Sequence, residues 1–338
     1  MKNVTVGDSI RETFCVLYIT QILCTFMLFE ESERQTVREK VFKDRNWASR
    51  FMKRYNFSFR RRTMKTANRF DPDNREHQIL VIEHLEKMKQ LMSIYNDDQI
   101  INMDETAIPY EPIPGLIIAE KGAKDVNPKD SVNPKQSCTG VVTVTKSGKL
   151  LKPMVILPQL KSNPFTLENC YVTHSHSGKM NDELMIEWFD NVIVPYLNEN
   201  GFENCLIILD QYGSHKTEFV KDYIKDLSTL HLLPSSTTGF LQPLDVNFFG
   251  VLKRNMTNKW ALQRFEETNG EMSVEEKLAV RRRAAVDLFI NEVNAIDKQT
   301  IIKSFHMCGI LNQNKITSTG LTETLIEIIT NFQQEIVY

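Results

Sequence analysis

Between residues 98 and 265, short apolar runs alternate with segments of helical periodicity, and this alternation restricts the fold more than any other feature. The runs of strand length are 99–103, 139–145, 150–157, 205–209 and 229–233. The stretch 146–149 (Lys-Ser-Gly-Lys) separates the second run from the third and predicts a hairpin. Helices are expected at 182–197, where Pro195 interrupts the end, at 216–226 and at 246–264. This order predicts an α/β protein with a mixed sheet and helices on both faces.

Three aspartates follow apolar runs of this region. Asp104 ends the run 100–103, Asp210 ends the run 206–209, and Asp245 follows 241–244. Each one alone is explained as well by a helix cap or a turn. Together they suit phosphodiester chemistry with two metals, which needs carboxylates from separate elements to converge on hard ions such as Mg²⁺ or Mn²⁺. Since open α/β sheets place active sites at strand ends, we expect all three to hold a pair of these ions.

The residues around the aspartates resemble those of a known family. Three stretches carry the resemblance: 102–106 (Asn-Met-Asp-Glu-Thr), 209–215 (Leu-Asp-Gln-Tyr-Gly-Ser-His), and 233–238 (Leu-Pro-Ser-Ser-Thr-Thr) leading to 241–245 (Leu-Gln-Pro-Leu-Asp). They are similar to the motifs of the pogo/Tigger/Jerky group of DDE transposases. The 34 residues between Asp210 and Asp245, the basic Lys253 and the segment 304–310 also suit that group.

The resemblance covers residues 98–312 in order. It implies an RNase H-like fold and a protein that cleaves and transfers DNA strands with Mg²⁺ or Mn²⁺, two ions per site. Asp104, Asp210 and Asp245 would be the catalytic metal ligands and Lys253 a DNA contact. The alternative is a domesticated, transposase-derived nuclear DNA-binding protein that no longer cuts.

Charge is distributed unevenly along the chain. Residues 34–69 contain thirteen Lys and Arg against two acids, a net charge of +11, whereas the rest of the chain carries −13. Such a segment is typical of a surface that meets polyanions, although a solvated basic face is the alternative. Residues 47–55 and 60–62 are similar to the end of a centromere-protein-B-type helix-turn-helix. The candidate DNA contacts are Arg50, Lys53, Arg54, Arg60, Arg61 and Arg62.

Other residues admit two interpretations. His215, five positions after Asp210, is either an auxiliary group beside the metals or a structural residue. Glu105 should point to the opposite side of the strand from Asp104, which favours a structural hydrogen bond. The aromatic residues Trp188, Phe189, Phe248 and Phe249 are expected in the core.

Five regions are expected along the chain. These are an atypical N-terminal segment (1–31), a partial basic helix-turn-helix region (32–70), a linker helix (71–97), a DDE endonuclease domain (98–265) and a C-terminal helical region (266–338). The apolar run 14–28 is short for a membrane span and favours a buried helix or a disturbed N-terminus over a targeting segment. Six scattered cysteines without a CxxC pair favour a reduced protein. Double-stranded DNA is the expected partner. The protein is expected to be a monomer or a homodimer, without membrane association and in the nucleus.

Overall fold

The chain divides into two compact units, each described here by itself. The smaller unit comprises residues 1–65 and 113–131, and the larger comprises 66–112 and 132–338. The computed structural model describes residues 53–54, 57–61, 70–110, 116–120, 136–158, 167, 169–211, 213–215, 217–263, 274–311 and 320–336. The predicted N-terminal segment and most of the predicted helix-turn-helix, with Arg50 and Arg62, lie outside the described residues.

The smaller unit contains a two-stranded antiparallel sheet. Strand β1 (Phe57–Arg61) pairs with β3 (Leu116–Glu120), so that Phe57 lies opposite Glu120 and Arg61 opposite Leu116. The helix-turn-helix structure predicted within 32–70 is wrong for 57–61, which form a strand. The alternating phenylalanines favour a strand, and β3, more than fifty residues later, supplies its hydrogen-bonding partners.

The larger unit is built on a mixed six-stranded sheet with the order β6-β5-β4-β2-β7-β8. Its central strand β2 is antiparallel to β4 and parallel to β7; β4 is antiparallel to β5, while β5–β6 and β7–β8 are parallel pairs. The strands are β2 (Ile100–Pro109), β4 (Ser137–Thr145), β5 (Met154–Pro158), β6 (Tyr171–Ser175), β7 (Cys205–Leu209) and β8 (Ser228–Leu232). The predicted hairpin and strand 205–209 are confirmed.

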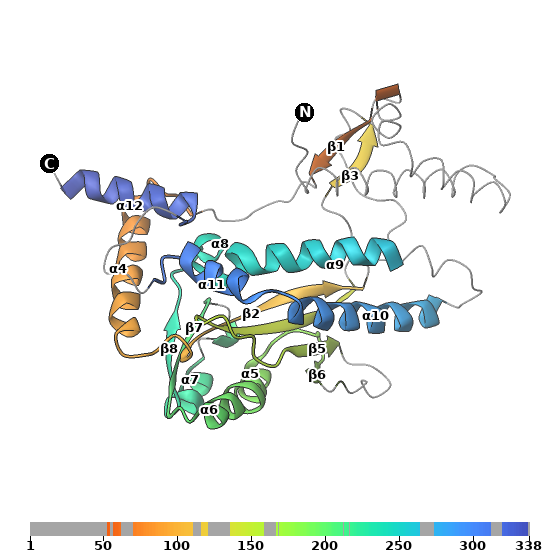
Figure 1. Ribbon diagram of the computed structural model, residues 1–338, viewed down its shortest axis with the longest axis horizontal. Helices are drawn as coiled ribbons and strands as arrows, with labels where there is room; N and C mark the ends of the chain where they lie inside the picture. Colours follow the sequence, from red (N-terminus) through yellow and green to blue (C-terminus); the bar gives the residue numbers. More distant parts are fainter. Residues whose placement is uncertain are drawn as a thin grey trace. The chain divides into compact units, whose positions relative to one another are not determined.

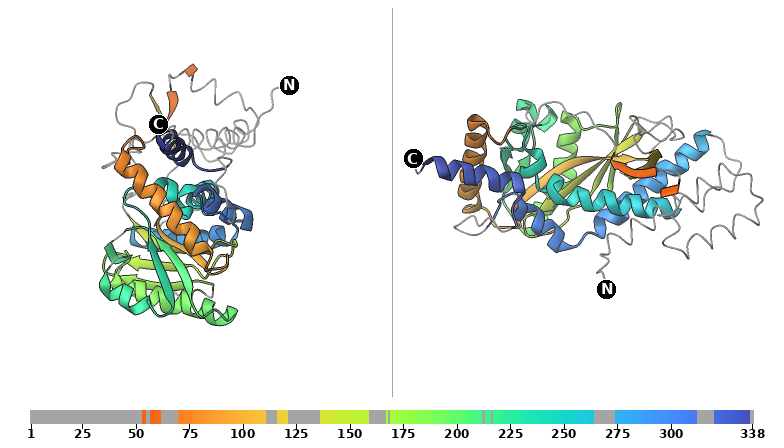
Figure 2. Two further views of the ribbon diagram at one scale, coloured as in Figure 1. Left: turned by 90° about the vertical axis from the view of Figure 1, so that its left-hand side faces the viewer. Right: turned by 90° about the horizontal axis from the view of Figure 1, so that it is seen from above.

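Helices cover both faces of this sheet, as the sequence predicted (Figure 1). One face carries α5 (Asp182–Trp188), the π-helical turn η1 (Phe189–Ile193), α6 (Val194–Asn200) and α7 (Glu218–Ile224). The other carries α8 (Thr238–Leu241), the π-helical turn η3 (Leu244–Phe248), α9 (Phe249–Gln263), α10 (Val274–Asn294) and α11 (Lys298–Met307). The left view of Figure 2 shows the two groups on opposite sides of the strands from a second direction.

Two more helices complete the larger unit. Helix α4 (Arg75–Met92) begins at Asn74, whose side chain accepts hydrogen bonds from the backbone of Glu76 and His77. It packs against α12 (Glu323–Ile336). Among the helices described, none combines the length and the apolar composition that a membrane crossing needs.

The alternation of side chains along β2 divides the core into two layers. Ile100 and Ile108 pack with α9–α11, whereas Ile101 and Met103 pack with α5–α7. All five residues of β7 are buried, which is typical of a parallel strand covered on both faces. The four aromatic residues expected in the core are buried there, namely Trp188, Phe189, Phe248 and Phe249.

The helical stretch after residue 182 differs from its prediction. Pro195 does not break it, because Pro195 lies in the first turn of α6, after the π-helical turn η1. Proline is tolerated at that position, since it lacks only an N–H that the first turn leaves unpaired.

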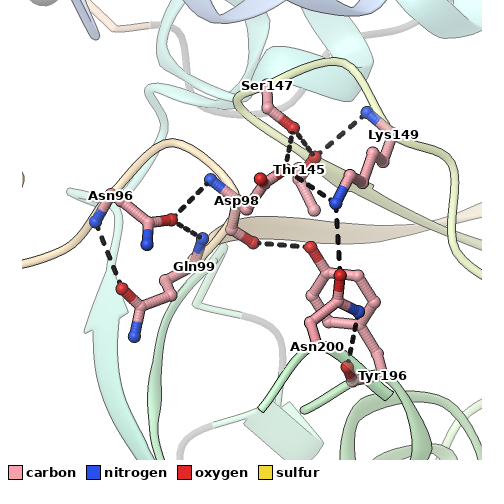
Figure 3. Close-up of polar contacts among 8 residues, drawn as sticks. All are labelled: Asn96, Asp98, Gln99, Thr145, Ser147, Lys149, Tyr196 and Asn200. Atoms are coloured by element: carbon pink, nitrogen blue, oxygen red, sulfur yellow. Dashed lines mark hydrogen bonds and ion pairs between the residues drawn. The ribbon is translucent and has the colours of Figure 1, made fainter. Parts of the chain in front are cut away.

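A polar network fixes the amino-terminal end of β2 (Figure 3). The Asp98 carboxylate accepts a hydrogen bond from the Ser147 hydroxyl and lies 3.1 Å from Lys149 Nζ. The Tyr196 hydroxyl donates to the Asp98 carbonyl at 2.9 Å. The bond from Ser147, and then Lys149, keep the pKa of the Asp98 carboxyl below its usual value. These contacts join β2, the β4–β5 turn and α6.

A buried histidine pair is expected to make folding stability depend on pH. His84 of α4 is 4% exposed, and its Nδ1 lies 2.9 Å from Nε2 of His231 in β8. Burial, and then His231, lower the pKa of His84 to about 3. The unfolded chain therefore binds the proton more tightly than the folded one. Stability should be full above about pH 6.5 and fall towards pH 3, by about 1.4 kcal/mol for each pH unit.

Denaturant unfolding of wild type and His84→Leu across this pH range measures the effect. Leucine has a similar volume and no titratable group, so we expect the variant to lose the part of the slope that His84 contributes. The pKa of His231 is also lowered, first by burial and then by Lys87, so His231 keeps its own part. Replacing the exposed His174 with glutamine is the control and should leave the slope unchanged. An equally steep slope in His84→Leu would show that other groups cause it.

Candidate active site

Asp104 lies within β2 and not at its end. The strand continues to Pro109 because β4 pairs with it along its length, with Asp104 opposite Val142. This corrects the predicted strand end at residue 104. Asp104 is only 6% exposed, and its Oδ1 accepts a hydrogen bond of 2.9 Å from the backbone N–H of Glu105. By the alternation along β2, it shares the α9–α11 face with Ile100 and Ile108.

Asp210 directly follows β7 and is bonded to a buried histidine. His215, in the short 3₁₀ helix η2 (Gly213–His215), has its Nδ1 2.8 Å from Asp210 Oδ1 and its Nε2 3.1 Å from Glu105 Oε1. Burial alone lowers the pKa of His215, but the hydrogen bonds to Asp210 and Glu105 outweigh it and raise the pKa to about 10. The ring is therefore an imidazolium at neutral pH and donates to both carboxylates.

Glu105 occupies the side of β2 that alternation predicts. It shares the α5–α7 face with Ile101 and Met103, opposite to Asp104. From there its carboxylate reaches His215, so the structural hydrogen bond favoured from the sequence is present. This bond fixes the ring that in turn holds Asp210.

Asp245 lies in the first turn of η3, which packs against β2. Burial raises the pKa of Asp245; Lys253 lowers it and Asp210 raises it. Lys253 is exposed on α9, and its Nζ lies 5.3 Å from the centre of the Phe249 ring. Asp245 and Lys253 are both exposed, and the effect of Lys253 on the pKa of Asp245 places a cation near the third aspartate.

The three aspartates interact with one another electrostatically. The pKa of Asp104 is raised well above its ordinary value, first by burial and then by the charges of Asp245, Glu105 and Asp210. Such mutual repulsion requires the carboxylates to be near each other, although they come from β2, the loop after β7 and η3. The site carries more negative charge than its histidine and lysine neutralise, and a cation would stabilise it.

The donor groups suit a hard metal ion. Carboxylate oxygens are the ligands that Mg²⁺ and Mn²⁺ prefer, and both ring nitrogens of His215 are engaged by carboxylates. Within the described ranges, no three His, Cys, Asp or Glu side chains are already arranged as a metal site. The fit to divalent ions therefore rests on the chemistry and charge of these residues and not on their present arrangement.

Two buried amides, which the sequence analysis missed, connect the segments that carry the aspartates. Asn102 and Gln242 are both 0% exposed. Asn102 bonds to Ile208 at the end of β7, to Gln242 and to Leu244, and Gln242 bonds to Met103. Asn102 lies in the motif stretch 102–106 and Gln242 in 241–245. The signal that could have found them is a polar residue inside an otherwise apolar run.

The predicted DNA contacts fall on both units. Lys53 and Arg54 are helical and exposed, and Arg60 and Arg61 lie on β1 of the smaller unit. Lys253 belongs to the larger unit. Arg50 and Arg62 lie outside the described residues.

Comparison with known families decides the class of this protein. A family model described as DDE superfamily endonuclease matches residues 135–305, half of the chain. The chain belongs to the DDE superfamily of endonucleases. The matched region of this DDE-superfamily protein includes Asp210 and Asp245, and Asp104 precedes it. The RNase H-like class expected from the motif resemblance is confirmed, with its mixed sheet and helices on both faces.

Individual relatives are distant. CENP-B homolog protein 2 of Schizosaccharomyces pombe is 22% identical over 267 residues, which are 75% of this chain and 49% of that protein. The chain thus spans about half the length of this curated relative. A solved mariner Mos1 paired-end complex with Mg is 14% identical, with a TM-score of 0.45. The match covers 86% of this chain and 74% of the Mos1 chain. The catalytic domain of Mos1 mariner transposase is 14% identical, with a TM-score of 0.39, and the match covers 72% of this chain and 93% of that domain's chain.

Proposed function

We propose that this DDE endonuclease cleaves and transfers DNA strands with two divalent ions, Mg²⁺ or Mn²⁺, held by Asp104, Asp210 and Asp245. The observation that carries the proposal is the mutual repulsion of three carboxylates that come from three separate elements. Placing like charges together in a partly buried site destabilises a protein unless a cation compensates them. Hard oxygen ligands in a member of the DDE superfamily suit that compensation.

The chain's own residues would divide the work. Asp104, Asp210 and Asp245 would provide the oxygen ligands, and His215 would orient the Asp210 carboxylate by donating to it. Lys253, beside Asp245 and exposed, would contact a DNA phosphate near the scissile bond. Two bound metal ions would activate the attacking water or hydroxyl and stabilise the leaving oxygen.

Nicking of supercoiled DNA tests this function. The purified chain should cut the plasmid with Mg²⁺ or Mn²⁺ and be inactive with Ca²⁺ or EDTA. DNA binding without cutting under every metal condition would instead favour the domesticated protein that keeps the fold.

The nuclear location and the homodimer stay predictions.

We also propose that the basic segment 34–69 binds duplex DNA mainly through phosphates. Affinity should then fall with salt, with a log–log slope of about −0.9 for each phosphate neutralised. The triple variant Arg60→Ala, Arg61→Ala, Arg62→Ala removes three positive charges and should flatten the slope.

A charge-matched control separates this effect from net charge. Lys89 lies on α4, Lys221 on α7 and Lys225 directly after α7, and their replacement by alanine removes the same charge. Fluorescence anisotropy titrations at several salt concentrations compare the two triple variants. Equal slopes for wild type and the arginine variant would show that the cluster is only a solvated surface.

A further inference from the structure

Asn102 connects the segments of the three aspartates through its side chain. Its Nδ2 donates to the carbonyl oxygen of Ile208 at 2.9 Å and to Gln242 Oε1 at 3.3 Å. Its Oδ1 accepts from the backbone N–H of Leu244 at 3.2 Å. Gln242 completes the connection by donating from Nε2 to the carbonyl oxygen of Met103 at 3.4 Å.

Each of these bonds ends close to an aspartate along the chain. Asn102 and Met103 precede Asp104 on β2, Ile208 is two residues before Asp210, and Leu244 is adjacent to Asp245. The amide pair therefore joins, through two side chains, the three backbone segments whose carboxylates repel one another.

The bond to Leu244 has a second consequence. The turn η3 begins after Pro243, and no side chain from its own N-terminus caps it. Asn102, on strand β2 and more than a hundred residues earlier in the chain, supplies an acceptor for the Leu244 N–H at the start of η3. The start of η3, and with it Asp245, is thereby fixed to β2 and not only to its own helix.

The two amides stabilise the fold as well as shaping it. The surroundings are apolar, with Leu241 and Leu244 both 0% exposed. An apolar pair would fill the same space but would leave the Leu244 N–H without this acceptor, which is costly in a buried place. What a satisfied buried polar network adds is a single defined geometry.

We propose that Asn102 and Gln242 are positioning residues that hold Asp104, Asp210 and Asp245 at the spacing needed for divalent ions. This inference rests on the proposed metal-dependent function. The pair touches neither the metal nor the DNA, and acts by fixing the backbone next to each ligand. Its loss should therefore weaken metal binding while leaving DNA binding intact.

The test is Mn²⁺ binding to the metal-free full chain, measured by electron paramagnetic resonance titration of free Mn²⁺. Gln242→Met keeps the length and volume of the side chain and removes its amide. Since losing a group that orients metal ligands costs about 10- to 100-fold in metal affinity, we expect the Kd for Mn²⁺ to rise by that factor. Duplex DNA affinity in Ca²⁺ should change less than about twofold, because the phosphate contacts are assigned to the basic segment proposed above.

Thr143→Val is the matched control. Thr143 is also 0% exposed, and its hydroxyl accepts a hydrogen bond from Trp188 Nε1 at 2.9 Å on the α5–α7 side of the sheet. The control loses a buried hydrogen bond of similar kind and should lower the melting temperature without changing the Kd for Mn²⁺. If Gln242→Met does not fold, Gln242→Asn replaces it; its amide is one methylene shorter, and we expect a smaller rise in Kd.

The outcomes are distinguishable. Tight Mn²⁺ binding by wild type with an unchanged Kd in the Gln242 variant would overturn the positioning role alone. An equal rise of the Kd in Thr143→Val would overturn it too, because general loosening would then be the cause. Absence of Mn²⁺ binding by wild type would overturn this inference together with the proposed function.

Discussion

Asp210→Asn is expected to abolish metal-dependent DNA cleavage, with a rate loss of about a thousandfold or more. The amide keeps the shape of the side chain but offers no negative oxygen to Mg²⁺. Loss of an ion that activates the nucleophile and steadies the leaving oxygen removes several kcal/mol of transition-state stabilisation, and a thousandfold corresponds to about 4 kcal/mol. His215 can still donate to the remaining amide oxygen, so the local structure should persist.

The expected pattern separates catalysis from folding and binding. Stability in metal-free buffer should change little, because the variant relieves the repulsion among three carboxylates but also loses the ion pair with the buried His215. DNA affinity in Ca²⁺ should stay nearly unchanged, since the phosphate contacts are assigned to the basic segment. The measurements are cleavage of a labelled duplex, a binding titration and thermal unfolding.

Asp226→Asn is the control for Asp210→Asn. It makes the same chemical change at an exposed position after α7 and should cut at the wild-type rate. Cleavage by Asp210→Asn at the wild-type rate would exclude Asp210 as a metal ligand. No cleavage by wild type or either variant would move the assignment to the non-cutting DNA-binding alternative.

Gly140→Val is expected to lower the free energy of unfolding by about 3 kcal/mol, at the upper end for overpacked cores. Gly140 lies on β4, where α10 approaches closely. A Cβ there would come within 2.7 Å of Phe289 Cε2 and 2.9 Å of Ile108 Cδ1. Phe289 and Ile108 are both 0% exposed, so neither can move aside without disturbing its own packing.

Gly250→Ala is the matched control. Gly250 is on α9, and a Cβ there meets nothing within 4 Å. Alanine should therefore raise stability by up to about 1 kcal/mol through its higher helix propensity. Thermal or denaturant unfolding of both variants measures the difference. A Gly140→Val protein as stable as wild type would show that the contact between α10 and the sheet is loose.

Local patterns in the sequence determined much of this protein. The apolar run 205–209, the hairpin between residues 139 and 157 and the helical periodicity predicted the mixed sheet covered on both faces. These features depend on neighbours in the chain, which is why pattern alone reveals them. The motifs around Asp104, Asp210 and Asp245 likewise indicated the DDE superfamily.

Only the tertiary structure decided where these elements meet. Strand β2 runs past Asp104 because β4 pairs with it, and 57–61 form a strand because β3 does the same. Asp210 and Glu105 both stabilise the charged form of His215, and Glu105 is 110 positions earlier in the chain. Asn102 fixes η3 from 142 positions away. Except for the one between Asp210 and His215, each of these contacts joins residues that are far apart in sequence. Such contacts form only when the long stretches of chain between their residues fold back on the sheet. A pattern of neighbouring residues therefore cannot predict them.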